Sequence, residues 1–133
     1  MEEIYVVGVG MTRFGRLPDQ NIKTMTKEAV NGALTDAGFD ASALKAGFFA
    51  NASQGHMENQ HMIRGQIALR SMGIGEIPVV NVENACASGS TALNLAINFL
   101  RAEKGTSRLP SARRKCSRKI AISCSVRSTA HGT

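Results

Sequence analysis

The sequence predicts an α/β fold in which helices cover a largely parallel sheet. Short β-branched and aromatic runs recur along the chain, and each is followed by a segment with apolar residues at helical spacing. This β-α-β-α-β-α order is typical of parallel strands joined by right-handed crossovers. The 133 residues, 43% hydrophobic and 20% charged, suit one globular domain and argue against a wholly disordered chain.

The first half of the chain contains two expected strands and the helix between them. Residues 4–9 are a β-branched run that ends in a Gly-Val-Gly segment, which predicts a buried strand entering a tight turn with positive φ. Residues 24–37 carry apolar side chains at helical spacing, and the start of this helix is open by a few residues. Gly38 suits the end of the helix, and residues 46–52 predict the second strand.

The second half of the expected domain contains two helices and a strand. Residues 56–72 show an apolar helical face, and Gly73 ends it. Residues 77–82 are β-branched and predict the third strand. Residues 87–100 are apolar nearly all round, so we expect a helix that is buried on every side.

The positive charge of the chain is confined to its last part. Residues 1–103 have 8 basic and 10 acidic side chains, whereas residues 104–133 have 8 basic and none acidic, which accounts for the net charge of +6. We therefore expect a domain over 1–103 followed by a basic, Ser/Arg-rich tail over 104–133. Within the tail, residues 120–122 with Val126 form an apolar patch that can pair as a strand. The tail lacks aromatic residues, so binding to nucleic acid is not favoured.

The cysteines and the N-terminal residues favour a reducing, cytoplasmic setting. Cys86, Cys116 and Cys124 show no CxxC spacing, so neither a zinc site nor a disulfide framework is expected. The chain begins Met-Glu-Glu with no secretory pattern, and no apolar stretch is long enough for a membrane span.

Two other motifs lack the spacing that cofactor or metal binding needs. The Gly8-Val-Gly10 turn has arginine where a dinucleotide fingerprint needs its third glycine, and the expected helix starts too late. His56 and His61 are five residues apart, which places them on different faces of a helix. Neither a bound dinucleotide nor a metal is expected.

Cys86, in the segment Asn84-Ala-Cys-Ala-Ser-Gly-Ser90, is the candidate catalytic residue. It stands between the expected strand and the apolar helix, and Asn84 is a residue type that favours the N-cap. Unpaired N–H groups and the helix dipole stabilise a thiolate at such a position. The small neighbours leave room for a substrate, and the same N–H groups can stabilise an oxyanion. The residues alone leave open a second interpretation, in which Cys86 is a small core residue.

The chain resembles the N-terminal part of a thiolase. The resemblance covers residues 3–101 and rests on Val6–Gly15, Ala37-Gly38, Ile77–Ser90 and the Thr-Ala-Leu that follows. The acetyl-CoA acetyltransferase and sterol-carrier-protein-associated branch is the most similar. Ketoacyl-ACP synthase III, a relative with a similar cysteine junction, is the alternative, and the Val-Glu-Asn-Ala-Cys-Ala-Ser-Gly block favours thiolase.

The resemblance implies a five-layer αβαβα fold, of which this chain would form a three-layer α/β fragment with a mainly parallel mixed sheet. It implies that an acyl-CoA substrate acylates Cys86, and that Claisen condensation or thiolytic cleavage follows. No covalently bound cofactor is implied, the coenzyme A contacts are not located, and the full-length family is usually homo-oligomeric.

The sequence departs from the family after the Cys86 helix. It has neither the Gly-His-Pro segment nor the late Cys-x-Gly-Gly block that supply the base and second cysteine, and Cys116 and Cys124 match neither. We therefore expect a truncated chain without full turnover. One hypothesis makes residues 104–133 an out-of-frame or disordered extension; the alternative is a non-enzymatic fragment whose basic tail mediates binding.

Overall fold

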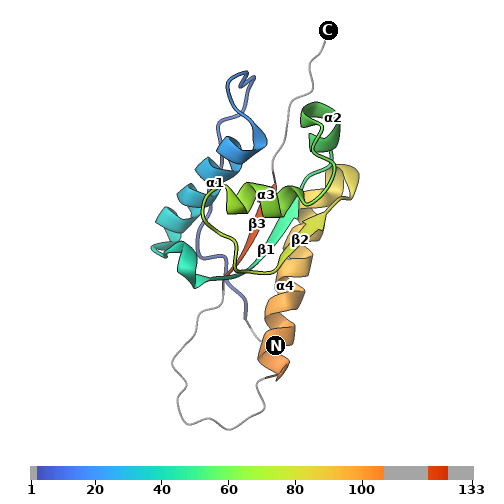
Figure 1. The fold of residues 1–133 in the computed structure, drawn as a ribbon. Coiled ribbons are helices and arrows are strands. Elements are labelled where there is room, and N and C mark those ends of the chain that lie inside the picture. The colour runs from blue at the N-terminus through green and yellow to red at the C-terminus, as the bar shows by residue number, and fades with distance from the viewer. Residues whose placement is uncertain (1–2, 107–119, 126–133) are drawn as a thin grey trace.

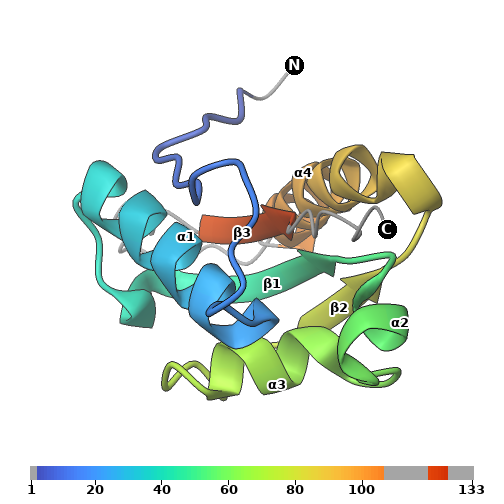
Figure 2. The same ribbon diagram turned by 90° about the horizontal axis from the view of Figure 1, so that it is seen from above.

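A computed structural model describes residues 3–106 and 120–125, with side chains described over 3–102. Three parallel strands form a sheet in the order β2-β1-β3. Helices α1 and α3 lie on one face of the sheet, and α4 lies on the other (Figure 1, Figure 2). The bounds are α1 Ile22–Ala37, β1 Leu44–Ala50, α2 Gln54–Glu58, α3 Arg64–Arg70, β2 Val79–Val82, α4 Ser88–Thr106 and β3 Ile120–Ser125. The expected layered α/β architecture with parallel strands is confirmed.

The central strand β1 supplies side chains to both layers of the core. Ala46, Phe48 and Ala50 pack toward Ala92 and Ala96 of α4. Phe49 of β1 points to the opposite face, where it belongs to a cluster with Ile22, Met25 and Ala68. Because successive side chains of a strand point to opposite faces, burial of both sets shows that helices cover this strand from both sides.

Helix α1 begins earlier than its apolar pattern suggests. Asn21 is the N-cap, its side chain accepts a hydrogen bond from the Thr24 N–H, and the Thr24 hydroxyl accepts one from the Asn21 N–H. This reciprocal pair fixes the start, although threonine replaces the glutamate or glutamine of the usual capping box. At the other end, Gly38 has a φ of 68° and closes the helix as expected.

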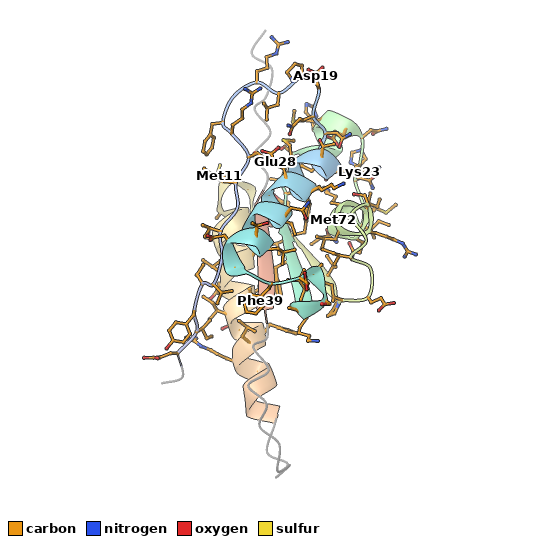
Figure 3. All side chains as sticks on the ribbon, turned by 90° about the vertical axis from the view of Figure 1, so that its left-hand side faces the viewer. Met11, Asp19, Lys23, Glu28, Phe39 and Met72 are labelled. Atoms are coloured by element: carbon orange, nitrogen blue, oxygen red, sulfur yellow. The ribbon has the colours of Figure 1, made fainter. Side chains whose placement is uncertain are left out.

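The prediction of a strand over residues 4–9 is wrong. This segment has no regular secondary structure, and Val6 and Val9 are 75% and 69% exposed. It runs alongside α1, as Figure 3 shows near Met11. Gly8 and Gly10 do not adopt positive φ; instead they allow close approach, because a Cβ on Gly10 would lie 2.0 Å from a carbonyl oxygen of α1.

The prediction of a single helix over residues 56–72 is also wrong, because the segment forms two short helices. Asn59 has a φ of 55° and ends α2, and Ile63 has a φ of 46° immediately before α3. Left-handed residues cannot continue a right-handed helix, and asparagine tolerates this conformation better than most residues.

Helix α4 is buried along one side, not all round as expected. Ala92 and Ala96 are buried against the sheet, whereas Leu93 and Leu95 are 47% and 37% exposed. Both leucines are therefore partly accessible, and only the side that faces the sheet is fully buried. Within the described residues no helix is long and apolar enough to cross a membrane.

The strand suggested for the basic tail is present as β3, parallel to β1. It spans Ile120–Ser125, so it includes residues 120–122 of the expected patch, while Val126 lies outside the described residues. Residues 107–119 of the tail also lie outside the described residues.

Candidate active site

Cys86 lies at the junction between β2 and α4. It is the middle residue of a 3-10 turn, η2 (Ala85–Ala87), which leads directly into α4 at Ser88. Its side chain is exposed and carries a free thiol. Ala85 has a φ of 44°, a conformation that costs a non-glycine residue about 1–2 kcal/mol, and it turns the chain sharply just before Cys86.

Hydrogen bonds on both sides hold the turn that carries Cys86. The Ser88 hydroxyl, in a residue only 5% exposed, accepts from the Asn84 N–H and donates to the Ala85 carbonyl, both at 2.8 Å. The Ala87 N–H donates to the Asn84 carbonyl at 2.8 Å, and the Ala85 N–H donates to Glu83 Oε1 at 2.8 Å. These bonds compensate for the strained φ and hold the backbone on both sides of Cys86.

The backbone around Cys86 offers a donor to an incoming group. The sequence predicts that the Asn84 side chain caps the turn, but it makes no capping hydrogen bond. Its Nδ2 donates instead to Thr91 Oγ1 at 3.0 Å. In the part of the chain that the structure describes, the Cys86 N–H has no hydrogen-bond acceptor. An exposed thiol beside such an N–H is suited to nucleophilic attack on a carbonyl with stabilisation of the oxyanion.

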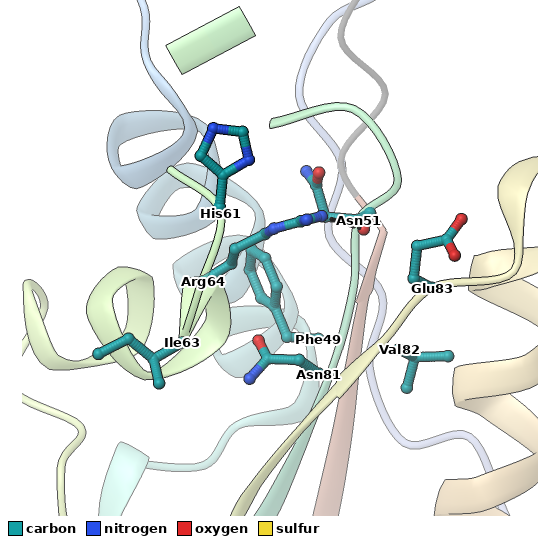
Figure 4. Close-up of a pocket in the computed structure, with 8 residues that line it drawn as sticks. All are labelled: Phe49, Asn51, His61, Ile63, Arg64, Asn81, Val82 and Glu83. Carbon is teal, nitrogen blue, oxygen red and sulfur yellow. Dashed lines mark hydrogen bonds between the residues drawn. The ribbon is translucent and has the colours of Figure 1, made fainter. Parts of the chain in front are cut away.

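A polar pocket of about 110 Å³ lies at the carboxyl ends of β1 and β2 (Figure 4). No motif in the sequence predicts this pocket, although polar residues directly after two strands are a usable signal, since ligands bind at this edge of parallel sheets. Its lining residues are Phe49, Asn51, His61, Ile63, Arg64, Asn81, Val82 and Glu83. Val82 and Glu83 connect the pocket to the chain segment that leads to Cys86.

The other two cysteines and the histidines considered in the sequence lie apart from Cys86 in the chain. Cys116 lies outside the described residues, and Cys124 is in β3, where it pairs in register with Phe49. His56 is in α2, whereas His61 lines the polar pocket. No group of three potential metal ligands occurs within the described residues.

Comparison with known proteins assigns the family. The family model described as "Thiolase, N-terminal domain" matches residues 4–109. The chain belongs to the thiolase family. The resemblance inferred from the block around Cys86 is thereby confirmed, and the family match includes the strand–turn–helix junction that holds this cysteine.

Individual relatives agree with the thiolase assignment. An acetyl-CoA acetyltransferase from Methanothermobacter thermautotrophicus is 40% identical over 97 residues, which are 73% of this chain and 25% of the relative. A non-specific lipid-transfer protein-like 2 from Caenorhabditis elegans is 39% identical over 108 residues, 79% of this chain and 24% of the relative. This chain therefore spans about a quarter of the length of these two relatives.

Solved structures support the thiolase-like fold. The acyltransferase ChlB3 aligns with a TM-score of 0.52 at 21% identity, over 63% of this chain and 25% of that one. A 3-oxoacyl-[acyl-carrier-protein] synthase III from Aquifex aeolicus aligns with a TM-score of 0.50 at 17% identity, over 65% and 27%. At these identities the likeness concerns the fold alone.

Proposed function

We propose that Cys86 is the acyl-accepting nucleophile of a thiolase-type acyl-CoA acyltransferase. The observation that carries the proposal is the position of an exposed thiol in a strained turn between a parallel strand and a long helix. Thiolase family membership supports acyl-CoA as the substrate class. The similarity to the carrier-protein synthase concerns the fold alone, so it does not favour an acyl carrier protein as donor.

The proposed first step transfers an acyl group to sulfur. The Cys86 thiolate attacks the thioester carbonyl carbon of acyl-CoA, a carbon–sulfur bond forms, and the carbonyl oxygen becomes an oxyanion near the Cys86 N–H. When the oxyanion collapses, the bond to the coenzyme A sulfur breaks and the leaving thiolate takes a proton from solvent. The products are S-acyl-Cys86 and free coenzyme A.

We expect this 133-residue chain to stop at the acyl-enzyme. Condensation needs a group that removes the α-proton of a second substrate, and the thiolase resemblance gives this role to a second cysteine in a Cys-x-Gly-Gly block that the 133 residues do not contain. A purified chain that condenses two acetyl-CoA molecules at ordinary enzyme rates would contradict this expectation.

The test is site-resolved acylation. The chain is incubated with acetyl-CoA, digested at acidic pH and mapped by mass spectrometry, with Cys116 and Cys124 as internal controls in the same molecule. We expect acetylation of Cys86 to be at least about tenfold faster than that of Cys116, because the turn holds an exposed thiol beside a backbone N–H that can stabilise the oxyanion. Equal rates at the two cysteines would refute Cys86 as the nucleophile.

A further inference from the structure

The polar pocket beside the Cys86 turn contains a buried donor without an acceptor. Asn51 is only 4% exposed, and its Nδ2 has no hydrogen-bond partner among the described residues. Its Oδ1 accepts from the Ser53 and Gln54 N–H groups at 3.1 and 2.8 Å. Exchanging the amide oxygen and nitrogen would lose both bonds, so the orientation of the amide is fixed.

Arg64 brings a permanent positive charge to the same pocket. It reaches from the start of α3 toward Asn51, as Figure 4 shows, and one Nη1–H donates to the backbone carbonyl of Asn51 at 2.8 Å. A guanidinium has five N–H donors, and within the described residues Arg64 has no carboxylate partner within ion-pair distance. Its remaining donors are available to a ligand.

Several other polar atoms of the pocket have hydrogen-bond partners within the chain. His61 Nε2 lies 2.9 Å from Asn59 Oδ1, and Asn81 Oδ1 accepts from the Gly65 N–H at 2.6 Å. Glu83 is the acidic residue of the lining, and its Oε1 accepts from the backbone N–H of the Cys86 turn. The unused donors of the pocket are the buried Asn51 amide and the Arg64 guanidinium, and the second carboxylate oxygen of Glu83 is an acceptor in the same lining.

We propose that this pocket, between Asn51 and Arg64, binds a carboxylate group. A carboxylate accepts hydrogen bonds through both oxygens and matches the planar fork of arginine. It would also satisfy the buried Asn51 donor, which is costly to leave unpaired. The cavity of about 110 Å³ has room for such a group, since one water in the liquid occupies about 30 Å³.

The location gives the carboxylate two possible sources. Glu83 precedes Cys86 by three residues, a backbone span of at most about 10 Å. The group can therefore belong to a free small carboxylate or to the far end of a dicarboxylic acyl thioester that reacts at Cys86. The second source rests on the proposed acyltransferase function, whereas the first does not.

Titration of the full chain with acetate tests the site, and acetamide of the same size but no charge is the matched probe. We expect acetate, not acetamide, to shift the NMR signals of the Asn51 amide and the Arg64 guanidinium. Asn51→Asp keeps the acceptor for Ser53 and Gln54 but replaces the donor with an oxygen. It should weaken acetate binding by at least about tenfold.

Two arginine variants separate the pocket from general charge effects. Arg64→Gln should weaken acetate binding by at least about tenfold, while Arg70→Gln, on the exposed far end of α3, should leave it unchanged. This pair keeps the test valid if Asn51→Asp fails to fold. Equal responses to acetate and acetamide, or an unchanged affinity in Arg64→Gln, would overturn the proposal.

The source is tested in Cys86→Ala, which cannot be acylated at this position. Tighter binding of glutaryl-CoA than of pentanoyl-CoA, lost with Arg64→Gln, would assign the carboxylate to an acyl thioester. Acetate binding without that preference would assign it to a free carboxylate, and both results support the pocket. Because acetate binding does not use the Cys86 thiol, failure of the acylation experiment leaves this test unaffected.

Discussion

Two apolar stretches of this chain, residues 4–9 and strand β1, have opposite fates. Residues 4–9 have four β-branched residues and a tyrosine, whereas β1 has two phenylalanines and no β-branched residue. Nevertheless β1 is buried between two strands, while Val6 and Val9 are exposed. A strand–helix–strand crossover would normally place residues 4–9 beside β1. Both edges of β1 are occupied, by β2 and β3, so that position is not available.

The comparison teaches that an apolar run becomes a strand only where a sheet edge can satisfy its backbone. Residues 4–9 instead lie against α1, where the glycines permit close contact and the Val9 N–H donates to Asp36 Oδ2 at 2.9 Å. Their large side chains stay in solvent. Composition alone predicted a strand here because it does not show whether a sheet edge is available.

The largest expected effect comes from matched phenylalanine substitutions in the two regions. Phe49 is 1% exposed, and Phe14, which follows the N-terminal run, is 76% exposed. Phe49→Ala should lower the free energy of unfolding by about 3–5 kcal/mol, because it removes buried contacts and leaves a cavity. Phe14→Ala should change it by less than about 0.5 kcal/mol. Urea unfolding followed by circular dichroism measures both, and similar losses would show that the N-terminal segment belongs to the core.

A smaller effect is expected from glycine substitutions at the two packing contacts. A Cβ on Gly65 would lie 2.5 Å from the Phe49 Cβ, so Gly65→Ala should destabilise the whole domain by about 1–3 kcal/mol. A Cβ on Gly10 would lie 2.0 Å from the Ala29 carbonyl oxygen, so Gly10→Ala should release the N-terminal segment from α1. Hydrogen exchange should then show faster exchange near Val9 and unchanged protection in β1; loss of protection in both would contradict the distinction.

The smallest effect is expected at the single polar contact of the N-terminal segment. Asp36→Ala removes the acceptor of the Val9 N–H on the exposed side of α1, which should cost less than about 1 kcal/mol. The Val9 amide should exchange faster, while the midpoint of global unfolding stays nearly constant. A large shift of that midpoint would mean that the contact stabilises the domain as a whole.

The sequence located most of the regular elements and the candidate nucleophile position. The strand 46–52, the strand 77–82 and the helix 87–100 correspond to β1, β2 and α4, and Cys86 lies at the expected junction. The split between α2 and α3 was missed because it depends on two residues in left-handed conformations. The pocket around Arg64 was missed because its residues come from separate segments and become neighbours only in the fold.

The sequence by itself determined the positions of α1, β1, β2 and α4, the end of α1 at Gly38 and the family block around Cys86, because these depend on local spacing and residue type. Only the tertiary structure decided which apolar run enters the sheet, which side of α4 is covered and which donors meet at the pocket. These features depend on competition for strand edges and on the proximity of distant segments, and local periodicity contains no information about either.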